Sequence, residues 1–128
     1  MKNTLITFLL CTALPFLCTS CFKEVDLGFP DTVAFTSEGG METVTGNTEF
    51  THAEIHDYKT GENGEVQKTE DGIYYNTYKW LKVEYREYGR NDRELKIYAE
   101  PNTTGKSRKL HIAVYSGPEY AVISVVQN

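Results

Sequence analysis

Residues 95–127 read LKIYAEPNTTGKSRKLHIAVYSGPEYAVISVVQ, and the pattern of this stretch decides the fold. Apolar residues occupy every second position in three runs, at 95–99, 110–114 and 123–125. An alternation of period two places one set of side chains on a buried face of a strand and the other set toward solvent. Turn residues separate the runs at 101–105 and 116–118. The stretch therefore predicts three successive β-strands, each buried on one face only.

The residues before this stretch continue the strand pattern. β-branched and aromatic residues favour strands at 33–35, 42–45, 50–58, 73–78 and 79–85. The Gly39-Gly40 pair predicts a hairpin turn between the first two of them. The polar, glycine-bearing stretch Thr60–Gly72 predicts a long exposed loop. Short strands with a turn about every ten residues, and no amphipathic helix, predict an all-β, two-sheet β-sandwich of about seven to eight strands.

The N-terminal residues 1–20 have the pattern of a secretory signal peptide, with Lys2 at the start, an apolar run at 5–17 and small residues before Cys21. The apolar run is shorter than the roughly 20 residues that a bilayer span needs, which favours a cleaved signal over a retained membrane helix. Leu17-Cys18-Thr19-Ser20-Cys21 resembles the bacterial lipobox, with Cys18 standing where the lipobox usually has Leu. This resemblance implies acyl chains on Cys21 that anchor the protein in a membrane.

Three segments are expected along the chain: a signal peptide at 1–20, a lipidated tether at 21–31 and a sandwich domain at 32–128. The tether is predicted because residues 22–31 are charged at Lys23, Glu24 and Asp26 and contain Gly28 and Pro30. Charges directly after an acylated cysteine resemble the surface-export signals of lipoproteins in the Bacteroidota. The expected location is the outer membrane, on the cell surface or else on the periplasmic face.

Charge and cysteine content exclude several kinds of function. The chain has 13 basic and 18 acidic residues, a formal net charge of −5 that becomes −6 once Lys2 leaves with the signal. An acidic surface disfavours nucleic acid as a partner. The three cysteines all lie at or before residue 21. The predicted domain therefore has no disulfide, no cysteine nucleophile and no cysteine-based zinc site.

Six short elements in order suggest a known family. They are FTSEGG at 35–40, WLKV at 80–83, LKI at 95–97, EPNTTG at 100–105, RKLHIAV at 108–114 and ISVVQ at 123–127. Together they resemble the BACON domain, an immunoglobulin-like β-sandwich common in Bacteroidota lipoproteins and glycan-processing proteins. The resemblance covers 33–127 and implies carbohydrate binding or a spacer role. The stretch from Phe50 to Lys79 is longer than is usual in that family, which predicts an extra or elongated hairpin.

Catalytic and metal chemistry find little support in the residue pattern. The acidic residues fall mainly in predicted turns and at solvent-facing positions, and no Gly-x-Ser-x-Gly motif is present. His52 and His56 share one face of a predicted strand, but residues four apart in a strand are about 13 Å apart, too far for one ion. We therefore expect a non-catalytic protein without a metal site or a cofactor.

Aromatic residues are the strongest candidates for binding, because the chain has nine tyrosines, all after residue 57, and one tryptophan. Alternation predicts that Trp80, Tyr98, His111 and Tyr115 face outward, where neighbouring strands would join them into a platform for sugar rings. The first hypothesis is thus weak binding of a polysaccharide or host glycan by a surface lipoprotein. Two alternatives stay open. The rings are ordinary strand residues of a spacer, or the protein is a structural accessory subunit of a surface protein complex.

Overall fold

The structure, a computed structural model, describes residues 22–128. The predicted signal peptide and the predicted acyl acceptor Cys21 lie outside the described residues. No helix long and apolar enough to span a bilayer occurs in the described part. That part forms ten strands: β1 (Lys23–Glu24), β2 (Thr32–Phe35), β3 (Gly40–Thr45), β4 (His52–His56), β5 (Glu65–Lys68), β6 (Ile73–Tyr78), β7 (Leu81–Arg86), β8 (Glu94–Ala99), β9 (Arg108–Ser116) and β10 (Glu119–Gln127).

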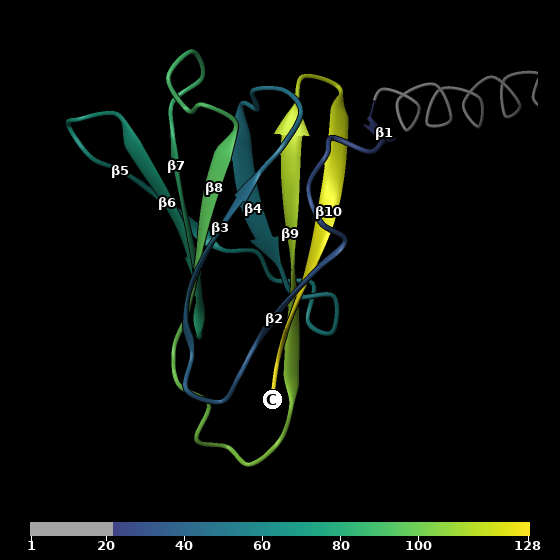
Figure 1. The fold of residues 1–128 in the computed structure, drawn as a ribbon, viewed down its shortest axis with the longest axis vertical. Helices are drawn as coiled ribbons and strands as arrows, with labels where there is room; N and C mark the ends of the chain where they lie inside the picture. The colour runs from purple at the N-terminus through teal and green to yellow at the C-terminus, as the bar shows by residue number, and fades with distance from the viewer. Residues whose placement is uncertain (1–21) are drawn as a thin grey trace, which may run out of the picture.

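The strands form two five-stranded sheets that face each other (Figure 1). One sheet has the order β1-β10-β9-β4, with β2 also paired to β10, and the other has the order β3-β8-β7-β6-β5. We call them sheet A and sheet B. Both β1 and β2 run parallel to β10, β1 beside its first residues and β2 beside its last. The predicted all-β, two-sheet sandwich is confirmed. The described part has ten strands rather than seven or eight, because β1 and β5 were not expected.

One hydrophobic core fills the space between the sheets. Every strand that alternates in sequence places its apolar residues there, as β8 does with Leu95, Ile97 and Ala99. The buried members of this core all lie between Leu27 and Val125. Residues 22–128 therefore contain a complete core and are expected to fold without residues 1–21.

The Gly39-Gly40 turn does not close a hairpin, which corrects the sequence prediction. β2 belongs to sheet A and β3 to sheet B, so the turn carries the chain from one sheet to the other. Gly39 has a φ of +76°, and a Cβ there would clash with the carbonyl oxygen of Ala99. Glycine is required for this crossing because the chain turns in the left-handed region against the backbone of β8.

Residues 22–31, expected to be a tether, lie along the domain instead. β1 pairs with β10, and Leu27 and Phe29 are buried in the core. The backbone N–H of Asn47 donates to the carbonyl of Leu27 at 2.7 Å, which fastens the segment a second time. The spacing of Val25, Leu27 and Phe29 at every second position was the sequence signal for this packing.

The stretch Thr60–Gly72, expected to be one exposed loop, contains strand β5. β5 pairs antiparallel with β6 and forms the extra hairpin that the length of this region predicts. All four β5 residues are exposed, so the strand adds backbone pairing to sheet B without covering the core. A strand of this kind has no alternation in its sequence, so the residue pattern did not locate it although the length of the region predicts a hairpin.

Candidate functional site

Aromatic and histidine side chains gather on the outer side of sheet A, over β4, β9 and β10. The register of these strands makes His52, Tyr115 and Tyr120 one row across the sheet, and His56, His111 and Ser124 another. Alternation in each strand turns these residues away from the core. We call this surface the aromatic face, and its ring-bearing members are Phe22, His52, His56, Tyr58, His111, Tyr115 and Tyr120.

The first row is a continuous set of ring contacts. The His52 and Tyr115 rings stack with centroids 4.5 Å apart and planes 11° from parallel. Tyr120 contacts the other side of Tyr115 at 5.7 Å, and the edge of Phe22 meets Tyr115 at 6.4 Å. Contacts at these distances are favourable for aromatic pairs and hold each ring in one orientation.

Tyr58 covers the second row from outside the sheet. It follows β4 in sequence, and its ring stacks on His111 with centroids 4.0 Å apart and planes 19° from parallel. The His56 ring lies 6.4 Å from Tyr58, and its Nδ1 lies 2.6 Å from the side-chain oxygen of Asn63. Tyr58 nevertheless keeps 63 % of its surface exposed, so its outer ring face is open to a ligand.

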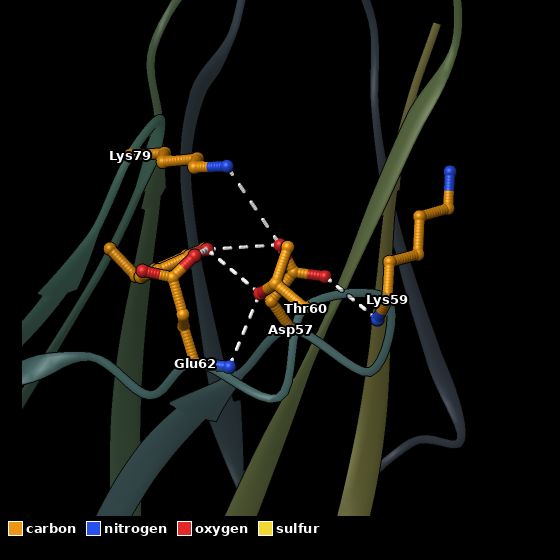
Figure 2. A network of polar contacts seen from close by, with 6 residues as sticks. Asp57, Lys59, Thr60, Glu62 and Lys79 are labelled. Carbon is orange, nitrogen blue, oxygen red and sulfur yellow. Dashed lines mark hydrogen bonds and ion pairs between the residues drawn. The ribbon is translucent and has the colours of Figure 1, made fainter.

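A polar network holds the turn that carries Tyr58. Figure 2 shows the side chains of Asp57, Thr60, Glu62 and Lys79 converging beside this turn, while the Lys59 side chain points away. The hydroxyl of Tyr78 lies 3.0 Å from a carboxylate oxygen of Asp57 and 3.1 Å from one of Glu62.

Backbone contacts complete the turn. The N–H of Lys59 donates to Asp57 at 3.0 Å, and the N–H of Gly61 donates to the Asp57 carbonyl at 2.8 Å. The Lys79 ammonium lies 3.9 Å from Asp57. These hydrogen bonds fix the turn that carries Tyr58. They attach it to Tyr78, the buried last residue of β6.

Of the two carboxylates at Tyr78, that of Asp57 is held in its ionised form. Burial acts to raise the pKa of Asp57, but hydrogen bonds from Lys59 and Tyr78, together with Lys79, lower it below its ordinary value. A general acid requires a carboxyl group with a raised pKa. Asp57 is thus an ionised acceptor that organises the turn.

Titratable groups on the aromatic face influence one another. Burial lowers the pKa of His111, and Lys109 and His56 add to the effect. Burial also lowers the pKa of His52, against the opposing effect of Glu54. Both imidazoles are therefore neutral at pH 7 and behave as flat, weakly polar rings.

The tyrosine hydroxyls on this face are also coupled to acidic neighbours. Burial raises the pKa of Tyr115, and Glu54, Tyr120 and Tyr58 raise it further. Burial raises the pKa of Tyr58, as do Glu24 and Tyr120. Each phenol is therefore protonated at neutral pH and offers one donor and one acceptor at the rim of the stacked rings.

The four residues predicted to form a platform do not lie together. His111 and Tyr115 are both on β9 and face outward on sheet A. Tyr98 is on β8 of sheet B, and Trp80 lies between β6 and β7 of that sheet. Only half of the predicted set therefore belongs to the aromatic face.

Trp80 is buried, which corrects the prediction that it faces solvent. It is only 8 % exposed, and the Arg108 guanidinium lies 4.6 Å from its ring centroid. Alternation failed here because Lys79 and Trp80 form the hairpin turn between the paired residues Tyr78 and Leu81, and Lys79 has a φ of +50°. A turn interrupts the alternation of the strand that follows it.

Tyr98 faces outward on sheet B, but its ring is covered. The Lys82 ammonium lies 4.7 Å from the Tyr98 centroid and 5.2 Å from that of Tyr75. The Tyr98 hydroxyl donates to Glu84 at 3.0 Å, and Lys96 lies 3.7 Å from the same carboxylate. This cation–π and ion-pair arrangement leaves Tyr98 less suited to stacking on a sugar than Tyr58.

An open groove of about 440 Å³ lies beside Tyr98 on sheet B. Its walls include Met41, Trp80, Leu81 and Lys82. In residues 22–128, no set of three or more His, Cys, Asp or Glu side chains is placed to hold a metal ion. The aromatic face joins seven rings, whereas this groove has only Trp80 and Tyr98, so we take the aromatic face as the candidate site for a stacking ligand.

Sequence reasoning missed five members of the aromatic face: Phe22, His52, His56, Tyr58 and Tyr120. His52 and Tyr120 sit directly opposite Tyr115 in the strand register, which only the strand pairing reveals. Tyr58 and Phe22 lie outside regular alternation, on a turn and before the first strand. The one available signal was the density of aromatic and histidine residues at 50–58 and 111–120.

Comparison with known proteins gives a family match for part of the chain and a structure of similar fold. Residues 69–128 match the BACON family model, which is described as "Putative binding domain, N-terminal". The match covers β6 to β10 and confirms the resemblance over that part. An NMR structure of a protein from Bacteroides thetaiotaomicron is similar, with a TM-score of 0.53 and 19 % identity over 84 % of each chain. At this identity the likeness shows the fold alone. No curated protein matches the chain.

Proposed function

We propose that this BACON-containing protein is a non-catalytic, lipid-anchored binding module of the outer membrane that holds a polysaccharide or host glycan weakly on its aromatic face. The observation that carries the proposal is the row of outward rings on sheet A, with Tyr58 stacked on His111 at its edge. The family description as a binding domain agrees with a binding role and names no ligand.

The chemistry of the aromatic face fits a sugar. A pyranose ring has an apolar face of C–H groups that packs against an aromatic ring, and its hydroxyls need donors and acceptors nearby. Tyr58 offers an open ring face, and Glu54 on β4 lies half-buried between the two rows of rings. The face is broad and open rather than enclosed, which favours binding along a chain of sugars with modest affinity.

Membrane attachment is proposed from the sequence. Cys21 follows the predicted export signal and directly precedes Phe22, the first described residue. Acyl chains on Cys21 would concentrate the domain at a membrane surface, where weak sites act together.

The test uses residues 22–128, which contain a complete core. Binding to an array of plant, host and microbial glycans is followed by isothermal titration of the hits. Tyr58→Ala and Tyr115→Ala are expected to lower affinity at least tenfold, while Tyr75→Ala on sheet B serves as the matched control. Absence of binding to every glycan, or an equal loss in the control, would contradict the proposal.

A second candidate function is that of an accessory subunit in a surface protein complex. The observation in its favour is β5, an edge strand whose residues are all exposed, with Val66 60 % exposed. Edge strands offer unpaired backbone groups to a partner strand. A Val66→Pro variant that loses a defined membrane partner in pull-downs, in a protein without glycan affinity, would favour this function over the first.

A further inference from the structure

The first described residues, which directly follow the predicted acyl anchor, are hydrogen-bonded to the domain and do not form a flexible linker. The backbone N–H of Lys23 donates to the Pro118 carbonyl at 2.9 Å, and the N–H of Val25 donates to the Tyr120 carbonyl at 2.8 Å. The Phe22 ring rests edge-on against Tyr115. Because Cys21 precedes Lys23 by two residues, an acyl group on it would start two residues from the backbone contact with the β9–β10 turn.

The chain entry, the β9–β10 turn and the β7–β8 loop lie at one end of the sandwich, as Figure 1 shows, and the β8–β9 loop and the C-terminus lie at the other. We call the first of these ends the anchor end. It comprises Phe22 and the loops 46–51, 69–72, 87–93 and 116–118, the second and third of which are joined by a hydrogen bond from the Glu87 N–H to the Gly72 carbonyl.

Hydrogen bonds make the anchor end one unit. The Ser116 hydroxyl donates to the Glu49 carbonyl at 3.1 Å, and the Gly89 N–H donates to the Glu49 carboxylate at 2.6 Å. The Asn91 side-chain amide donates to the Phe50 carbonyl at 2.6 Å. The loops therefore present a defined surface, fixed relative to the point where the chain enters.

The exposed groups on the anchor end suit the headgroup layer of a bilayer. Phe22 is 61 % exposed and Tyr88 is 65 % exposed, and both belong to this end. The charges beside them are mixed: Lys23 and Arg90 are exposed, Arg90 lies 3.8 Å from Glu87, and Asp92 and Glu119 are exposed as well. Aromatic rings are enriched at membrane–water interfaces, where the ring is partly buried and polar groups stay wet. Two rings alone would bind weakly, so the acyl chains supply the affinity and the rings set the orientation.

We propose that the anchor end rests directly on the bilayer that holds the acyl chains, so that the domain stands upright with its β8–β9 loop away from the lipid. This inference rests on the lipid anchor at Cys21 in the proposed function. It differs from a tethered domain, because residues 22–29 are fastened to the sandwich instead of spanning a gap.

Single cysteines test the orientation, since residues 22–128 contain none and Cys21 is consumed by acylation. Thr48→Cys and Arg90→Cys place an environment-sensitive fluorophore at the anchor end. Thr103→Cys and Ser107→Cys place it on the β8–β9 loop as matched controls, and all four positions are exposed. The full chain is lipidated in cells, purified and reconstituted in vesicles of phosphatidylethanolamine and phosphatidylglycerol.

We expect blue-shifted emission and protection from aqueous iodide for the labels at 48 and 90, and water-like emission for those at 103 and 107. Equal behaviour of all four labels on vesicle-bound protein would overturn the orientation and leave the anchor intact. Wild-type chain that fails to float with vesicles would overturn the anchor, and this inference with it. The double variant Phe22→Ser, Tyr88→Ser removes both rings. We expect it to reduce the difference in emission and iodide protection between the labels at the two ends, while the protein stays bound to the vesicles.

Discussion

The side-chain oxygen of Asn76, on β6 of sheet B, accepts a hydrogen bond from the backbone N–H of Ile55, on β4 of sheet A, at 2.9 Å. The N–H of Gly64 donates to the Ile55 carbonyl at 2.9 Å, so both backbone groups at this point of the β4 edge are satisfied. The Asn76 side chain of sheet B thus covers the open edge of sheet A at Ile55.

Replacement of Asn76 by Ala is expected to lower the free energy of unfolding by about 1–3 kcal/mol, because the buried Ile55 N–H loses its acceptor. Asn76 is fully buried, so water does not replace the lost bond easily. The Asn76 amide nitrogen is buried without a hydrogen-bond partner in the described part, which destabilises the folded protein. Alanine removes this unfavourable group, so we expect a loss of about 1 kcal/mol, toward the lower end of the range. Urea unfolding measures the change. Thr77→Ala, at an exposed neighbouring position, is the control, and an equal effect there would contradict the interpretation.

Gly64→Ala is expected to destabilise the protein by about 1–3 kcal/mol through crowding, since a Cβ at this position would clash with the Asn76 side chain. In an Asn76→Ala background the same substitution should cost clearly less. Urea unfolding of the two single variants and the double variant gives the coupling energy. Strict additivity would show that the two residues do not share this contact.

Tyr78→Phe is expected to loosen the turn that carries Tyr58, because it removes the hydroxyl that contacts Asp57 and Glu62 while keeping the ring in the core. Tyr58 should then leave His111, and the pKa of His111 should rise toward its ordinary value as water reaches the imidazole. Titration by NMR of the His111 ring protons measures this shift. Tyr75→Phe is the control. An unchanged His111 pKa in Tyr78→Phe would mean that the network does not position Tyr58.

Stability should fall as the pH drops below about 6.5. The pKa values of His52 and His111 are lowered from 6.5 in the folded protein, so the unfolded chain takes up these protons first. The stabilisation from their neutral forms is full above pH 6.5 and is lost as the pH falls through the folded pKa values. Urea midpoints at pH 7.5 and 5.5 measure the loss. A His52→Gln, His111→Gln variant should show a smaller difference between its urea midpoints at the two pH values. A difference as large as that of the wild type would mean that other groups cause the pH dependence.

Cys21→Ala is expected to move the protein from the membrane fraction to the soluble periplasmic fraction, because it removes the predicted acyl acceptor. Fractionation with immunodetection measures the distribution. Cys18→Ala, which keeps Cys21, is the matched control and should stay with membranes. Retention of Cys21→Ala in the membrane would mean that the anchor lies elsewhere or that the signal segment is not cleaved.

Whether a strand could be predicted from the sequence depends on how its side chains are buried. Alternation at 95–127 predicts β8, β9 and β10 well, because each strand covers the core with one side only. The extra hairpin was predicted from length alone, and strand β5 could not be located within it because none of its residues enters the core. The segment with Leu27 and Phe29 was taken for a tether because charges and glycine outweighed a short apolar alternation.

Candidate site residues were harder to predict than strands. Alternation gives the side of a strand on which Tyr98 or Tyr115 lies, but it does not say which sheet the strand joins. That is why Tyr98 was grouped with Tyr115 although the two residues lie on different sheets. Tyr58 reaches His111 from a turn, and such a contact depends on the Asp57 network rather than on any local pattern.

The two ends of the sandwich also differ in which chain terminus they carry. Asn128 is bound at the far end, where the Asn102 side chain donates to its carbonyl oxygen at 2.9 Å. The nine-residue strand β10 separates this point from the β9–β10 turn, a length of about 30 Å. An enzyme or epitope fused genetically after Asn128 would therefore be held about 30 Å from the anchor end by a paired strand, and not by a flexible linker. With the lipid anchor proposed at Cys21, the sandwich would hold such a fused protein at a fixed distance from the bilayer.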